Sequence, residues 1–258
     1  MGHATTSFVI SDSTYPGAGA SHVAHVFPRQ TGSYADLSIQ AANLMTFGAY
    51  GIPASGPNLC GYAPQTADEE LCVRYFQLAI TSPLAVLNSM IAPMPYTFQS
   101  KTRTGIVTAL RQRLSLFSYM RASLRDISDK GGVMHTPLFA MFVQYGFTED
   151  ILAASDVSGF MYGPALRVEL QYKQFTYEKE VRFPAGSRWV RLNTWDTYVT
   201  GQDYLSIMAK TGIDKEVNIY QMDSTIVPLQ DASTAMRVED LMNASYTLSV
   251  ALGNQNTA

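Results

Sequence analysis

The sequence predicts a mostly β fold: an eight-stranded antiparallel jelly-roll β-sandwich, with a short helix before the third strand and an extended N-terminal arm. Three observations lead to this prediction. Short apolar runs separated by turn residues fill the chain beyond residue 70, several of them alternate with a period of two, and the first quarter is rich in Gly and Pro but poor in charge. Irregular connections without a repeat period favour a two-sheet sandwich, and an up-and-down barrel is the alternative.

The chain divides into three predicted parts. These are an arm over residues 1–69, a sandwich over residues 70–225, and a C-terminal extension over residues 226–258 with one further candidate strand. Before Asp68 the only charged residues are Asp12, Arg29 and Asp36, and Gly and Pro recur. Such a segment is too apolar for a solvated linker and too rich in turn residues for a regular core. We therefore expect an arm that neighbouring subunits order, with a loop-rich cap on the same domain as the alternative.

The strand candidates share length, apolar content and flanking turn residues. They are Cys72–Ile80, Leu116–Leu124, Leu138–Tyr145, Ala165–Tyr172, Tyr177–Phe183, Trp189–Leu192, Tyr204–Ala209, Val217–Met222 and Tyr246–Ala251. In the fourth of these, Leu166 and Val168 alternate with Arg167 and Glu169. This alternation predicts one face in the core and one face in water.

One segment has helical spacing instead. Ile106, Val107, Leu110 and Leu114 recur at that spacing, while Arg111 and Arg113 lie off the stripe. We predict a helix from Thr104, its cap, to Leu114, packed by Ile106, Val107 and Leu110. A strand should follow directly, with Phe117, Tyr119 and Arg121 on one side.

Few residues offer catalytic chemistry. The four histidines, His3, His22, His25 and His135, have no metal-binding spacing, and no nucleophile or phosphate-loop motif occurs. Acidic pairs at Glu149 and Asp150 and at Asp68 to Glu70 are interpreted as solvated charge rather than as the carboxylate pair of a glycosidase. We predict no catalytic residue, no metal and no cofactor. Cys60 and Cys72, twelve residues apart, fit neither a zinc site nor a disulfide framework and are expected to be buried thiols.

Charge points to only local contacts with nucleic acid. The net charge is −3, so the whole molecule should not be attracted to RNA. Between Lys101 and Lys130 basic residues outnumber acidic ones; they either form a weak RNA contact or spread over several faces and pair with acids of neighbouring subunits. No apolar run is long enough for stable membrane insertion, and no secretory leader is evident. Met1, Gly2 and Thr6 match a short myristoylation pattern.

Two strings resemble capsid proteins of the picornavirus type. Leu110 to Arg121 is similar to their passage from a basic helix end into an F-T-Y-M-R strand, and Ser158 to Val168 is similar to their Y-G-x-A-P-A-R stretch. The positions that carry the resemblance are Leu110, Arg111, Phe117, Tyr119, Met120, Arg121, Tyr162, Gly163, Pro164 and Ala165. The first of the three major shell proteins is the closest. Ser118 and the segment from Tyr145 to Asp150 depart from the family pattern and indicate a divergent relative.

The resemblance implies a structural capsid protein of a small icosahedral positive-strand RNA virus. Its partners would be homologous capsid proteins, copies of itself, genomic RNA weakly, and an unidentified host receptor, all in a virion assembled in the host cytoplasm. The charged fraction of 15%, against roughly 25% in typical proteins, favours a surface covered by other subunits. The alternative is a lectin-like sandwich in which Trp189, Trp195 and Tyr198 stack on sugar rings.

Overall fold

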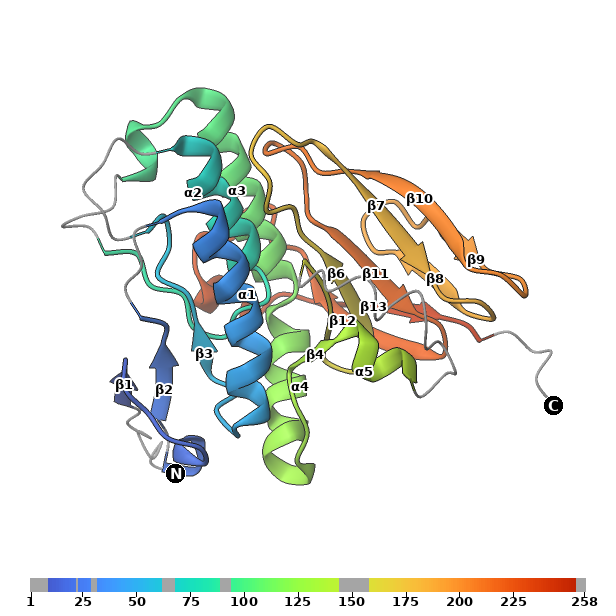
Figure 1. Cartoon of the computed structure of the whole chain (residues 1–258), viewed down its shortest axis with the longest axis horizontal. Coiled ribbons are helices and arrows are strands. Elements are labelled where there is room, and N and C mark those ends of the chain that lie inside the picture. The colour runs from blue at the N-terminus through green and yellow to red at the C-terminus, as the bar shows by residue number, and fades with distance from the viewer. Residues whose placement is uncertain are drawn as a thin grey trace.

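The computed structural model describes residues 9–21, 23–28, 32–61, 68–88, 94–143 and 158–253. A helical half with short parallel strands is followed by a half made mostly of antiparallel strands (Figure 1). The first half contains β1 (Val9–Ser11), β2 (Val23–Val26), α1 (Tyr34–Ala49), β3 (Ser55–Gly56), α2 (Glu69–Ala79), α3 (Ser100–Ser115) and α4 (Phe117–Lys130), with 3-10 turns at Ala18–Ser21 and Pro95–Thr97. The second contains β4 (His135–Pro137), α5 (Leu138–Val143), β5 (Gly159–Tyr162), β6 (Leu166–Glu169), β7 (Glu178–Phe183), β8 (Arg188–Arg191), β9 (Thr197–Val199), β10 (Leu205–Lys210), β11 (Asn218–Met222), β12 (Thr225–Gln230) and β13 (Tyr246–Ala251), with a 3-10 turn at Val238–Leu241.

The jelly-roll prediction is wrong, and so is the extended arm. Strands β1, β2 and β3 form a parallel sheet, and α1 follows β2. Helix α1 begins where the Ser33 side chain accepts the Asp36 N–H at 3.0 Å. It buries Leu37, Ala41 and Leu44 at helical spacing. The predicted boundaries at residues 69 and 225 stay a prediction.

The predicted passage from helix to strand near residue 116 is also wrong. Helix α3 begins at Ser100 rather than Thr104, and after a break at Leu116 (φ −89°, ψ 0°) the chain continues as α4. Leu116, Tyr119, Met120 and Ser123 are buried, which is the three-to-four residue period of a helix and not the alternation of a strand. Ile106 is buried as expected, whereas Val107 and Leu110 lie on the exposed side.

Two other strand predictions fall on helices. Cys72–Ile80 lies almost entirely in α2, and the described part of Leu138–Tyr145 lies in α5. The strand predictions that overlap β6, β7, β8, β10, β11 and β13 are confirmed. The predicted water-facing side of β6 is wrong, because Arg167 and Glu169 are as buried as Leu166 and Val168. Alternating polarity thus predicted the strand but not that both of its faces are covered.

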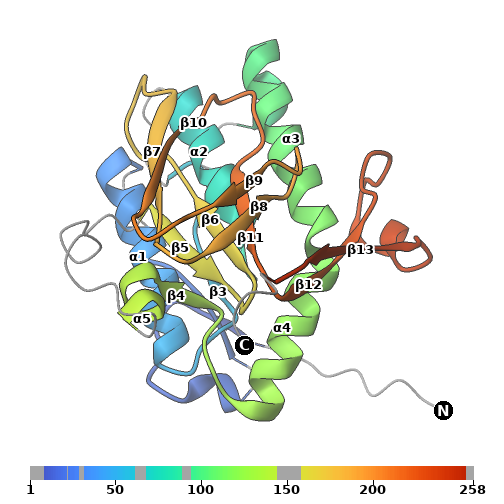
Figure 2. The same cartoon turned by 90° about the vertical axis from the view of Figure 1, so that its right-hand side faces the viewer.

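The antiparallel half is built around a six-stranded sheet in the order β4-β5-β6-β11-β8-β9. The β7–β10 pair lies against it, and the β12–β13 pair packs beside α4 (Figure 2). One apolar core joins residues of α1, α2, α3 and α4 to β5, β6 and β11, and a smaller core around Trp189 and Phe183 lies between the sheet and β7–β10. No helix within the described ranges is long and apolar enough to cross a membrane.

Candidate active site

The carboxyl ends of the parallel strands meet on one side of the helical half. Ser11 pairs in register with His25, and His25 with Ser55. A fourth segment runs parallel beside β3, since Leu84 N–H donates to Ser55 O at 3.2 Å and Asn58 bridges to Val86. A Cβ on Gly56 would lie 1.6 Å from Leu84 O, so only glycine permits this approach. Parallel sheets carry their sites at the carboxyl ends of the strands, so we take this edge as the candidate site.

The buried side-chain amide of Asn58 links the ends of β2 and β3. Phe27 N–H donates to Gly56 O at 2.9 Å, and the Asn58 side-chain amide donates to Phe27 O at 2.6 Å. Asn58 is 9% exposed, whereas Asp12, which directly follows β1, is exposed. The ends of β2 and β3 are therefore held in fixed register, with one carboxylate beside them.

His25 lies just behind this edge. Its ring stacks on Phe47 with 3.9 Å between centroids, and its Nδ1 is 2.9 Å from Thr14 Oγ1. Burial lowers the pKa of His25, and the nearby Asp12 charge opposes that shift. The imidazole is therefore neutral at pH 7. Within the described residues His25 Nε2 and the buried Ser55 Oγ have no hydrogen-bond partner.

A disulfide joins Cys60 to Cys72 and corrects the prediction of two free thiols. It links the turn after β3 to Cys72, the fourth residue of α2. Cys60 has a left-handed backbone, with φ 63°. No local pattern indicates that residue 60 lies in such a turn, so the spacing of the two cysteines alone did not predict the disulfide.

The three acidic residues at the start of α2 each bind a different partner within the chain. Asp68 caps the helix by accepting the Leu71 N–H at 3.1 Å. Glu69 accepts the Thr102 hydroxyl at 2.7 Å. Glu70 is buried and pairs with the buried Arg74 at 3.1 Å. These carboxylates are bonded within the chain, and the interpretation as solvated charge is wrong for Glu70.

Arg74 connects α2 to the antiparallel half. Its guanidinium donates to Thr211 O at 2.6 Å and to Thr176 O at 3.1 Å. Burial lowers the pKa of Arg74, and the Glu70 carboxylate opposes that shift. The loop between β6 and β7 is thereby fixed over the start of α2. Nothing in the sequence marked Arg74, because its carbonyl partners lie 102 and 137 residues away.

The ten positions of the capsid resemblance fall on two helices and one turn. Leu110 and Arg111 lie in α3, Phe117, Tyr119, Met120 and Arg121 lie in α4, and Tyr162, Gly163, Pro164 and Ala165 lie in and after β5. Several of them meet: Tyr119 OH donates to Tyr162 O at 2.8 Å and accepts the Ala165 N–H at 3.1 Å. Gly163 has φ 58°, and a Cβ there would lie 2.4 Å from Tyr119 OH. This cluster is a structural joint between α4 and the β5–β6 turn.

Three of the basic residues between Lys101 and Lys130 bond within their own chain. Arg113 donates to the carbonyls of Ala79, Ser82 and Pro83. Arg125 pairs with Asp129 at 2.8 Å, and Lys130 with Asp126 at 2.6 Å. Pairing with neighbouring subunits is not needed to explain these three.

Comparisons with known proteins find similarity to a different family from the one expected. Residues 2–122 match the glycosyl hydrolases family 31 TIM-barrel domain. An α-glucosidase of Hordeum vulgare is 27% identical over 254 residues, which cover 97% of this chain and 28% of the relative. Alpha-xylosidase 1 of Arabidopsis thaliana is 25% identical over 250 residues, which cover 95% of this chain and 26% of the relative. The chain thus spans about a quarter of the length of the curated relatives it matches.

Solved structures give the same result for the fold. The GH31 α-xylosidase of Xanthomonas citri superposes with a TM-score of 0.79 at 20% identity, over 95% of this chain and 27% of the other. The GH31 dextranase of Flavobacterium johnsoniae superposes with a TM-score of 0.80 at 17% identity, over 96% of this chain and 30% of the other. The fold is therefore that of the corresponding part of family 31 glycosidases.

These findings overturn the functional side of the capsid resemblance. The matched proteins are glycosidases, so neither a structural shell protein nor a lectin-like module is supported. The prediction that the protein is not an enzyme is wrong on the same ground. Shell partners, genomic RNA and a virion location lose their basis, since relatives include a lysosomal α-glucosidase of Mus musculus and structures of ER glucosidase II.

Proposed function

We propose that this chain forms the last part of the catalytic barrel, and the β-domain after it, of a glycosidase that hydrolyses α-linked glucosides or closely related α-glycosides. The observation that carries the proposal is the match of residues 2–122 to the family 31 barrel domain, in a chain whose parallel strands end at one common edge. Active sites of such barrels lie at that edge.

Hydrolysis of a glycoside requires two carboxyl groups at the active site. One carboxyl group protonates the leaving oxygen, and a second acts as nucleophile or as the base for water. Among the described residues that directly follow the parallel segments, Asp12 is the only carboxylate. The proposal therefore assigns at least one member of the carboxylate pair to strands outside those residues.

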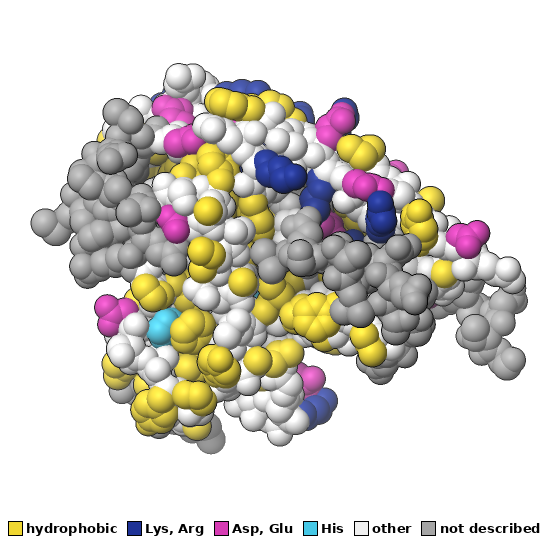
Figure 3. All heavy atoms as spheres, in the orientation of Figure 1, with side chains coloured by type: hydrophobic (Ala, Val, Ile, Leu, Met, Phe, Trp, Pro, Cys, Tyr) yellow, Lys and Arg dark blue, Asp and Glu magenta, His cyan; other side chains and the backbone are white. Residues whose placement is uncertain are grey.

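Exposed apolar residues on β1 also support the proposal that further strands complete the barrel. A TIM barrel closes with eight parallel strands, and the described residues contain β1, β2, β3 and the segment beside Val86. Val9 is 60% exposed and Ile10 48% exposed on β1. Hydrophobic side chains gather over this region, at the lower left of Figure 3. The remaining strands would cover them.

The substrate class comes from what the relatives are named for. They include α-glucosidases and an α-xylosidase, and one solved relative is a dextranase. The first two are named for α-linked sugars, so we propose an α-linked pyranoside as substrate. The Cys60–Cys72 disulfide favours maturation in an oxidising compartment.

The test uses the protein as its source produces it. Purified protein is given 4-nitrophenyl α-D-glucopyranoside, the α-D-xylopyranoside, and the β-D-glucopyranoside as the matched control. Release of nitrophenol from an α-glycoside but not from the β-anomer is the expected result. Release from the β-anomer alone, or from none of the three, would reject the proposed function.

A further inference from the structure

An exposed aromatic residue in a strained conformation marks a second surface beside the candidate edge. Phe175, in the loop between β6 and β7, has φ 53° and is 73% exposed. A left-handed backbone is unfavourable for a bulky residue, and exposing a phenyl ring to water is unfavourable as well. Phe175 therefore has two unfavourable features, its backbone conformation and its exposed ring. Strain of this kind is retained where the surrounding structure enforces it, and it is concentrated at functional sites.

The loop under Phe175 is held rigidly. The Phe175 N–H donates to Glu70 Oε2 at 3.3 Å, and Arg74 donates to the next carbonyl, that of Thr176, at 3.1 Å. Arg74 is 2% exposed and Glu70 8% exposed, so the support is a buried ion pair. A ring held in this way loses little conformational freedom when a ligand binds.

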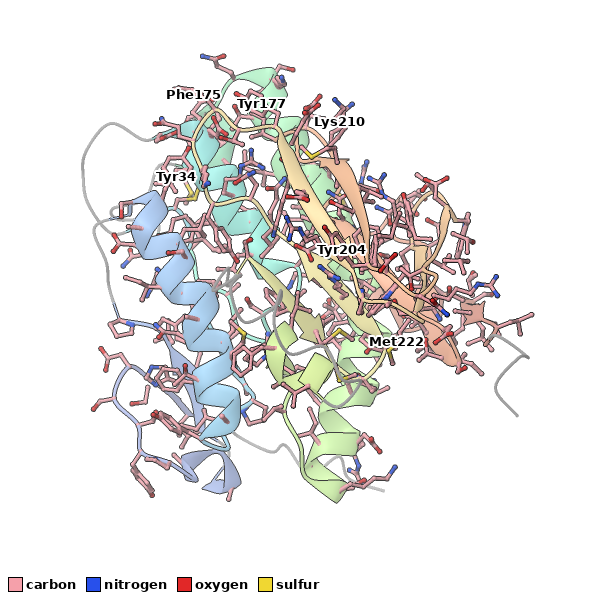
Figure 4. The ribbon with its side chains drawn as sticks, turned by 45° about the vertical axis from the view of Figure 1, so that its right-hand side comes forward. Tyr34, Phe175, Tyr177, Tyr204, Lys210 and Met222 are labelled. Atoms are coloured by element: carbon pink, nitrogen blue, oxygen red, sulfur yellow. A yellow bond between two sulfur atoms is a disulfide. The ribbon has the colours of Figure 1, made fainter. Side chains whose placement is uncertain are left out.

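Polar groups lie next to the ring. The Gln174 side chain donates to Asp68 Oδ2 at 3.0 Å, which leaves its amide oxygen free to accept from a ligand. Tyr177 is 46% exposed. In Figure 4 Phe175 and Tyr177 lie at the top of the molecule, close to the start of α2, and Tyr34 lies at the start of α1. Helices α1 and α2 both begin on the side to which the carboxyl ends of β2 and β3 lead.

This combination matches the chemistry of a pyranose ring. One face of such a ring presents C–H groups, which pack on the electron-rich face of an aromatic side chain. Its hydroxyls both donate and accept, and the amide of Gln174 and the carboxylate of Asp68 suit them. We propose that Phe175, Gln174 and Asp68 bind a sugar unit of an oligosaccharide substrate at the rim of the barrel, away from the bond that is cleaved. The inference rests on the proposed function. It involves none of Trp189, Trp195 and Tyr198, the aromatic residues of the rejected lectin interpretation.

The experiment measures maltopentaose binding to the full protein by isothermal titration calorimetry. Phe175→Asn is the central variant, because asparagine tolerates the left-handed backbone and lacks an aromatic ring on which a sugar could pack. It should raise Kd at least tenfold and leave Tm unchanged or higher. Phe175→Trp should keep the affinity. Trp195→Ala is the matched control, since Trp195 is also exposed and left-handed, with φ 61°, and lies in the β8–β9 turn. It should leave Kd unchanged.

Hydrolysis separates this inference from the proposed function. Phe175→Asn should raise KM for maltopentaose while leaving kcat/KM for the nitrophenyl α-glucoside unchanged. If the protein hydrolyses α-glycosides but Phe175→Asn binds maltopentaose as tightly as the parent, the sugar surface is rejected and the function stands. If Phe175→Asn abolishes binding in a protein that hydrolyses nothing, the surface stands and the function fails. Protection of this loop by a bound protein, without any effect of maltopentaose, would also overturn the inference.

Discussion

His135 couples stability to pH at the scale of a single residue. It is 1% exposed, its Nε2 lies 3.0 Å from Thr81 O, and it stacks on Tyr162. Burial lowers its pKa from 6.5 to about 4. The unfolded chain therefore takes up a proton near pH 6.5, while the folded chain does not until about pH 4. Over that window the unfolded state binds more protons, so stability falls as pH falls.

We predict that the free energy of unfolding decreases between pH 6.5 and pH 4, by up to about 3 kcal/mol from this residue. His135→Phe should lower stability at pH 7 but flatten this slope, because nothing then titrates at that position. His25, whose pKa is also lowered, keeps part of the slope in the variant. Urea unfolding at several pH values measures both quantities. Equal slopes in the parent and the variant would contradict the buried neutral imidazole.

The Cys60–Cys72 disulfide gives a second prediction for single residues. It closes a short loop and fixes the turn after β3. Cys60→Ser should lower the free energy of unfolding by about 3 kcal/mol, the order expected for a loop of this length. Dithiothreitol should destabilise the parent equally and leave Cys60→Ser unchanged. If reductant has no effect on the parent, the disulfide is absent in solution.

At the scale of elements, Tyr119 fastens α4 to the β5–β6 turn. Its hydroxyl serves both Tyr162 O and the Ala165 N–H in a buried site. Tyr119→Phe removes the hydroxyl partner of both backbone groups and should cost about 2 kcal/mol of stability. Tyr96→Phe is the control, since Tyr96 is 74% exposed, and should change stability by less than about 0.5 kcal/mol. Equal effects in thermal unfolding would show that the joint contributes nothing.

The elements also show where sequence reasoning succeeded. Strands β7, β10 and β13 alternate or are flanked by clear turn residues, and they were predictable. Helix α2 was mistaken for a strand because nearly all its residues are buried, so no polar face revealed the helical period. In α4 the buried stripe of Leu116, Tyr119 and Met120 carried a helical signal, but the similarity to a viral strand outweighed it.

At the scale of the whole molecule the two halves share one core. Buried residues of α2 and α3 belong to the same apolar cluster as Ile219 of β11. Ile219→Ala should therefore lower the free energy of unfolding by about 3 kcal/mol, and native-state hydrogen exchange should show the same loss in α2 and in β11. Ile226→Ala, at a residue that is 60% exposed, is the control. A loss confined to β11 would mean that the halves unfold separately.

The site was far less predictable than the strands. His25 and Asn58 reach the candidate edge only because parallel strands pair there. Arg74 meets its carbonyl partners only because a distant loop folds over α2. No local pattern encodes either meeting. The chain also spans about a quarter of the length of relatives such as the α-glucosidase of Hordeum vulgare, and the sequence offered no carboxylate pair that would have suggested a glycosidase. The two strings of the capsid resemblance were an amphipathic helix and a Gly-Pro turn, which many folds contain.

The most direct test of the account is the anomeric preference of hydrolysis by the protein as its source produces it. Nitrophenol release is followed with the α-D-glucopyranoside, α-D-xylopyranoside and β-D-glucopyranoside substrates under the same conditions. The account predicts turnover of at least one α-glycoside and none of the β-anomer. Turnover of the β-anomer alone, or of no substrate by a protein shown to be folded by its unfolding transition, would contradict it.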